Sequence, residues 1–123
     1  MESQIELDPT VSQVAVARQF VHDALVGWDG DHDTHTTILL TSELVTNAVI
    51  HAQSAIGLTI RYEPPRVTVE VHDDSDRLPL DLVVDSAAGG GRGVHLVSLL
   101  ADDWGVRSIP GQGKVVWFTL GPR

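Results

Sequence analysis

The sequence contains no cysteine, and this absence excludes several kinds of chemistry together. Thiol catalysis, disulfide bonds and zinc sites with thiolate ligands all require cysteine. No apolar run approaches the roughly 20 residues that a transmembrane helix needs. The first nine residues are acidic, whereas a signal peptide begins with basic residues. We therefore expect a cytoplasmic protein that does not span a membrane.

Basic residues are also few, with eight Lys and Arg against 17 Asp and Glu, which gives a net charge of −9. Because these basic residues are scattered, a phosphate-rich polymer would be repelled on approach. The composition therefore predicts no direct contact with nucleic acid, and any effect on gene expression would pass through another protein. A small phosphate-bearing ligand remains compatible with this charge, since backbone amides and a divalent cation can hold phosphates.

The 123 residues are typical of a single compact domain, residues 1–123, with its own hydrophobic core. Apolar periodicity predicts helices over residues 12–26, over a central stretch capped by Asp33 or Thr34, and over 94–100. Alternating patterns predict strands over residues 4–7, 56–62, 67–72, 104–109 and 114–120. This order favours an α/β (α+β) two-layer sandwich, in which a mixed, mainly antiparallel sheet carries helices on one face.

The central helix carries a ladder of three polar residues, Glu43, Asn47 and His51. They are four residues apart and so lie on one helix face. A carboxylate, an amide oxygen suited to a hard cation and a titratable imidazole form one wall of a polar site. The alternative is an ordinary solvated face at helical spacing.

The apolar residues of this helix predict two buried sides. One side would pack against the sheet, and the other would line a pocket beside the polar ladder. The residues expected on the sheet side are Ile38, Val45, Ala48, Val49 and Ala52. The residues expected in the pocket lining are Leu39, Leu40 and Ile50.

Two later segments carry further candidate groups. Asp73 ends a strand, where a fixed carboxylate can accept a hydrogen bond from an exocyclic amine such as that of adenine. The alternative is a solvated acidic turn. The glycines of residues 89–93 precede a helix, so that bare backbone amides and the helix dipole could meet a phosphate. The alternative is a flexible hinge before an ordinary helix start.

The order of these segments resembles the nitrogen, first-glycine and second-glycine boxes of the GHKL (Bergerat-fold) ATPases. The closer resemblance is to the small histidine-kinase-like domains of the anti-sigma-factor serine/threonine kinase family, and it covers nearly the whole chain. Residues 42–52 (SELVTNAVIHA) are specific, and residues 91–97 (GRGVHLV) and 101–105 (ADDWG) support the match.

The resemblance implies that ATP and Mg²⁺ bind here. Asn47 would coordinate Mg²⁺, and Glu43 would be the general base that draws a proton from the attacking hydroxyl. Asp73 would accept the adenine amino hydrogen. His51 would take a supporting role at the helix end, although a purely structural histidine remains the alternative.

The second-glycine box is implied to hold the phosphates. Gly91 and Gly93 would let the backbone pass close to them, and Arg92 would offset their charge. Residues from about 74 to 92 would form the ATP lid.

The chain departs from the family pattern at three positions. Ser75 and Arg77 stand where the first-glycine box has glycines, and a side chain there narrows the cavity or reshapes the turn. Lys114 stands where many relatives carry a threonine near the adenine, so that contact is not carried over.

The resemblance implies an enzyme that binds Mg·ATP and phosphorylates a serine or threonine of an antagonist (anti-anti-sigma) protein. In the family the same domain also sequesters a sigma factor, and relatives often form homodimers. The main alternative is a nucleotide-gated interaction module that binds ATP and a protein but transfers nothing. An ATPase that hydrolyses for its own conformational cycle is a third alternative.

Overall fold

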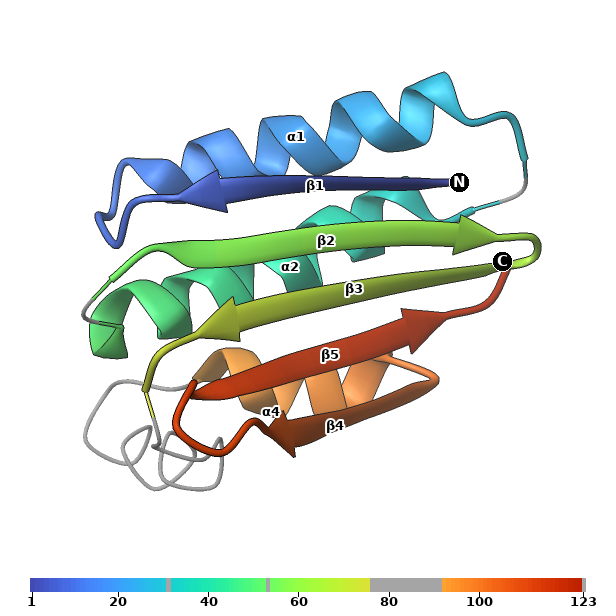
Figure 1. Ribbon diagram of the computed structural model, residues 1–123. Helices are drawn as coiled ribbons and strands as arrows, with labels where there is room; N and C mark the ends of the chain where they lie inside the picture. Colours follow the sequence, from blue (N-terminus) through green and yellow to red (C-terminus); the bar gives the residue numbers. More distant parts are fainter. Residues whose placement is uncertain (31, 53, 76–91, 123) are drawn as a thin grey trace.

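The fold is one antiparallel sheet covered on one face by helices, as Figure 1 shows for the computed structural model. The structure describes residues 1–30, 32–52, 54–75 and 92–122. The strands lie in the order β1-β2-β3-β5-β4, and each neighbouring pair is antiparallel. This arrangement confirms the predicted fold class.

The elements follow the predicted order, with ends that differ from the expected ones by at most two residues. They are β1 (Glu2–Leu7), α1 (Gln13–Gly27), α2 (Thr34–His51), β2 (Ile56–Glu63), β3 (Arg66–Asp73), α4 (Arg92–Leu100), β4 (Asp103–Ser108) and β5 (Lys114–Leu120). None of the helices in the described part of the chain is both long and apolar enough to cross a membrane.

The core lies between the sheet and the helices, because every second residue of the central strands faces inward. On β3 these residues are Val67, Val69 and Val71, and on β5 they are Val116, Phe118 and Leu120. Helix α1 packs onto this layer through Ala17, Val21 and Leu25, all fully buried. Alternation on the strands and helical spacing on α1 thus build one continuous apolar layer.

Helix α2 begins at the predicted cap. The Asp33 side chain accepts a hydrogen bond from the Thr36 backbone N–H at 3.0 Å, which satisfies one of the free amides of the first turn. Two buried threonines follow, Thr37 and Thr41, and each hydroxyl donates to the backbone carbonyl oxygen four residues earlier. Thr41 Oγ1, for example, donates to the Thr37 carbonyl oxygen at 2.7 Å. A helix with polar residues can therefore lie inside the fold.

The prediction that α2 has a second buried apolar side is wrong in part. Leu40 is fully buried, but Leu39 is 36% and Ile50 59% exposed. Helices α1 and α4 both pack against α2 and leave these two side chains uncovered. On the other side, Val45 and Ala48 are buried as expected, whereas Ile38, Val49 and Ala52 are only partly so.

Candidate functional site

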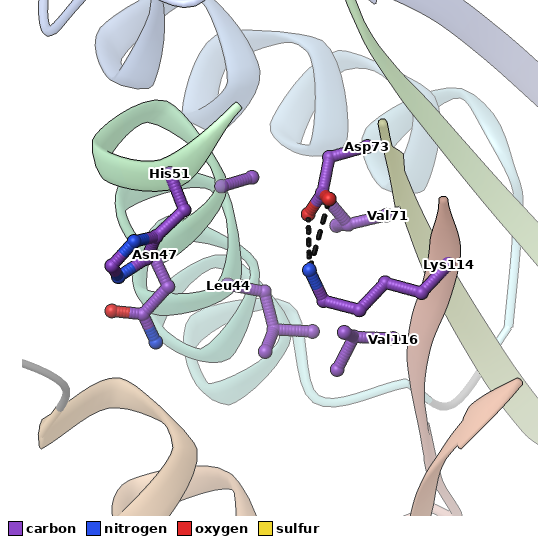
Figure 2. Close-up of a pocket in the computed structure, with 8 residues that line it drawn as sticks. Leu44, Asn47, His51, Val71, Asp73, Lys114 and Val116 are labelled. Carbon is purple, nitrogen blue, oxygen red and sulfur yellow. Dashed lines mark hydrogen bonds and ion pairs between the residues drawn. The ribbon is translucent and has the colours of Figure 1, made fainter. Parts of the chain in front are cut away.

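A small pocket lies under the C-terminal half of α2, at the end of the sheet where β3 ends and β5 begins (Figure 2). The cavity that the described walls enclose is about 10 Å³, which is room for about one water molecule and far below the volume of a ligand pocket. Residues 76–91 are outside the described residues, so this volume refers to the described walls alone. The lining residues are Leu44, Asn47, Ala48, His51, Val71, Asp73, Lys114 and Val116.

The pocket brings together polar groups that are far apart in the sequence. Asn47 and His51 come from α2 on one side, and Asp73 and Lys114 come from β3 and β5 on the other (Figure 2). The aliphatic side chains of Leu44 from α2 and of Val71 and Val116 from the strands complete the lining (Figure 2). The amide and the carboxylate that the sequence singled out therefore share one cavity.

Asp73 is held in a buried ion pair with Lys114. The ammonium lies 2.9 Å from Oδ1 and 3.1 Å from Oδ2, and each side chain is only 3% exposed. The strand register explains the contact, because Asp73 stands directly opposite Lys114. The pair is the last inward-facing rung of the β3–β5 ladder, beyond the rung of Val71 and Val116. Two charges are thus placed where the hydrophobic layer ends.

The backbone around Asp73 adds two constraints. The Ser75 N–H donates to Asp73 Oδ1 at 2.8 Å, and the Lys114 ammonium also reaches the Ser75 carbonyl oxygen at 3.4 Å. Gly113 has a φ of +87°, and a Cβ there would lie 2.6 Å from the Asp74 Cα and would overlap the Asp73 carbonyl oxygen. A glycine is therefore required for the β4–β5 turn to approach β3 so closely.

Asn47 is a buried amide with an unused donor. Its side chain is 6% exposed, and Nδ2 has no hydrogen-bond partner in the part of the chain that the structure describes. A buried polar atom without a partner costs free energy, so its position beside a pocket points to a ligand. The amide oxygen suits a hard cation, and the amide nitrogen suits a phosphate oxygen.

Magnesium needs few ligands from the protein when phosphates and water supply the rest. The described residues contain no group of three or more His, Asp or Glu that could hold a metal alone. Asn47 therefore fits the metal of a nucleotide better than a metal site made only of protein groups.

Glu43 and His51 flank Asn47 on α2, and both are half-buried. His51 lines the pocket, whereas Glu43 lies one helical turn before Asn47 and is not among the lining residues. Of the three predicted polar residues on this helix face, Asn47 and His51 therefore line the pocket and Glu43 does not. Glu43 occupies the neighbouring turn of the same helix face.

The second-glycine segment is described only in part. Helix α4 begins at Arg92, two residues earlier than predicted, so that Gly93 lies in its first turn. Val97 of this helix is fully buried, and α4 packs against α2. Gly91, the side chain of Arg92 and residues 76–91 of the predicted lid lie outside what the structure describes.

Comparison with known protein families assigns the chain to one family. The model of the histidine kinase-like ATPase domain matches residues 7–120. Since the match covers nearly the whole chain, the protein belongs to the histidine kinase-like ATPase domain family. No curated protein was found to match the chain. Family membership implies that ATP is the ligand and that any reaction is ATP-dependent and kinase-like.

Sequence reasoning missed the contact that Lys114 makes. The signal was present in β5, where Lys114 precedes Val116, Phe118 and Leu120 at a spacing of two. Such alternation predicts that the lysine shares their inward face. The opposite partner could not be named without the register, which pairs β3 with a strand more than forty residues later.

Proposed function

We propose that this protein binds Mg·ATP and phosphorylates a serine or threonine of an antagonist protein, and that it also sequesters a sigma factor. One observation supports the nucleotide site above all others, namely the shared pocket of the buried Asn47 amide and the Asp73 carboxylate. The kinase and the two protein partners rest on the resemblance of residues 42–52 and 91–97 to the anti-sigma-factor kinases. A cytoplasmic location and a homodimer remain predictions.

Each residue of the proposed site has a role that suits its side-chain chemistry. Asn47 would hold the metal through its amide oxygen, and Asp73 would recognise the base. Glu43, one turn from Asn47, would accept the proton of the attacking hydroxyl. The bound Mg·ATP supplies the phosphoryl group and neutralises its charge, so the protein contributes mainly positioning.

A second function is favoured by a specific observation. The ion pair between Asp73 and Lys114 engages the carboxylate that would recognise the base, and Ser75 replaces a glycine beside it. A chain with a weakened base site could serve as a nucleotide-gated interaction module without transfer. Phosphoryl transfer to a partner protein separates the two functions.

Nucleotide binding is tested by thermal unfolding with and without Mg·ATP. At a Mg·ATP concentration of about 100 times Kd, binding raises the free energy of unfolding by about 2.7 kcal/mol, which corresponds to a rise in Tm on the order of 10 °C. Asn47→Ala should lose this rise because it removes the metal ligand. Gln4→Ala removes an exposed amide from β1, at the far edge of the sheet, and should keep it. If the Tm of the natural protein does not change when Mg·ATP is added, both functions are excluded.

Catalysis is tested with radiolabelled ATP and candidate antagonist proteins from the same genome. Glu43→Gln should retain the thermal shift but lower the transfer rate by about 10²- to 10⁴-fold, because it removes the base and keeps the shape. Undiminished transfer would exclude Glu43 as the base. Label on no candidate, together with intact ATP binding, would favour the interaction module.

A further inference from the structure

The carboxylate of Asp73 has little hydrogen-bonding capacity left. A carboxylate offers about four acceptor positions. The Lys114 ammonium contacts both oxygens, at 2.9 and 3.1 Å, and the Ser75 N–H takes a further position on Oδ1 at 2.8 Å. One position is left, on Oδ2, and the ammonium also contacts that oxygen, so an amine of a ligand would have to share Oδ2 with the ammonium or displace it.

This ion pair is shielded from water. Both side chains are 3% exposed, and the pair lies between the aliphatic side chains of the last apolar rung and the residues of α2 (Figure 2). Charge-assisted hydrogen bonds are strong in such surroundings. Displacing the ammonium therefore costs more than displacing water from an exposed carboxylate.

We propose that Lys114 is a specificity-determining residue that competes with the nucleotide base for Asp73. The proposal rests on the proposed nucleotide site and adds to it how strongly, and for which base, that site selects. Asp73 alone accepts from the 6-amino group of adenine. With Lys114 in place, the pocket presents a donor beside the acceptor, which also suits a base with a 6-oxo group.

The competing explanation is a structural ion pair that only joins β3 to β5. In that case the loss of Lys114 lowers stability without a change in base preference. General electrostatics predicts the opposite sign for affinity, because removing a cation from a protein of net charge −9 weakens the binding of an anionic nucleotide. Only competition for Asp73 predicts tighter ATP binding after the loss of a positive charge.

The experiment titrates the natural protein and Lys114→Met with Mg·ATP and with Mg·ITP, whose base carries an oxygen in place of the amine. The control is Arg107→Met, which removes a cation from β4. Arg107 is 57% exposed, its guanidinium is 3.6 Å from Glu70, and it does not line the pocket. The two variants therefore change the net charge equally but only one frees Asp73.

Lys114→Met should bind ATP at least about tenfold more tightly than the natural protein, which corresponds to one charge-assisted hydrogen bond released to the ligand. The affinity ratio of ATP to ITP should rise by a similar factor. Arg107→Met should show unchanged or weaker binding of both nucleotides and an unchanged ratio. An unchanged ratio in Lys114→Met would overturn the proposal.

A second variant covers the case in which Lys114→Met does not fold, since it leaves a buried carboxylate without its cation. Lys114→Gln keeps a hydrogen-bond donor for Asp73. Its ATP affinity and its affinity ratio of ATP to ITP should rise as in Lys114→Met, but by smaller factors. If Lys114→Gln folds and matches Arg107→Met, the proposal fails although nucleotide binding stands. Binding of neither nucleotide by any of these proteins would remove the proposed function and this inference with it.

Discussion

Gly113 determines how closely the β4–β5 turn approaches the end of β3. Its φ of +87° disfavours any other residue, and a Cβ would meet the backbone of Asp73 and Asp74. Gly111 in the same turn also has a positive φ, of +75°, but a Cβ there would meet nothing within 4 Å. A substitution at Gly111 therefore tests conformational strain alone, whereas a substitution at Gly113 tests strain together with steric overlap.

We predict that Gly113→Ala destabilises the protein by at least about 2 kcal/mol more than Gly111→Ala. Gly111→Ala has only the cost of a left-handed alanine, about 1–2 kcal/mol, whereas Gly113→Ala must also push the two strands apart. Urea unfolding of both variants measures the difference. Equal losses would show that the turn relaxes freely and that Gly113 does not position Lys114.

At the scale of the element, α2 carries the candidate metal ligand and the candidate base, so its start affects the site. Asp33 caps its first turn through the Thr36 N–H. We predict that Asp33→Ala lowers the free energy of unfolding by about 1 kcal/mol and that Asp33→Asn restores most of it, because an asparagine side chain also accepts this bond. Chemical denaturation of the two variants measures this. A loss in Asp33→Asn as large as that in Asp33→Ala would assign the effect to the carboxylate charge.

The elements themselves were largely predictable from the sequence, because each depends on a local signal. The cap at Asp33, the helical spacing of Ala17, Val21 and Leu25, and the alternation of β5 are all visible without a fold. Asn47 and Asp73 could be named as candidates from such local signals, but only the resemblance to the GHKL ATPases chose the site over a solvated helix face and a solvated turn.

What could not be predicted depends on how elements meet. The exposure of Leu39 and Ile50 is set by where α1 and α4 cross α2, and a helical wheel contains no such information. The contact between Asp73 and Lys114 is set by the pairing of β3 with β5, which are joined through a long connection and another strand. Register is a property of a strand pair and not of either strand.

At the scale of the whole molecule, the site lies where the core ends. The inward rows of β3 and β5 are apolar until their last rung, and there the apolar layer gives way to a charged pair under α2 (Figure 2). The chain has a net charge of −9, and Lys114 is the one cation among the residues that line the described pocket. Binding of an anionic nucleotide must therefore rely on local donors and metal, since the overall charge opposes it.

The described elements share one hydrophobic cluster, and this predicts a single cooperative unfolding transition. Leu7 of β1 and Val97 of α4 belong to the same cluster, against which Trp28 and Trp104 also pack. Trp28, just after α1, stacks on Tyr62 of β2 with ring centroids 6.5 Å apart, whereas Trp104 and Trp117 lie on β4 and β5 at the opposite side of the sheet. The tryptophans therefore report on both sides of the molecule.

Two variants separate these signals. Trp28→Phe leaves fluorescence only from β4 and β5, and the double change Trp104→Phe and Trp117→Phe leaves it only from Trp28. Within each variant, the urea midpoint of tryptophan fluorescence should equal that of far-UV circular dichroism, because a single domain with one core unfolds in one step. Circular dichroism corrects for any stability that each variant loses. A fluorescence midpoint that departs from circular dichroism in either variant would show that the two sides of the sheet unfold separately, and the chain would then not be the single cooperative domain that its length and core predict.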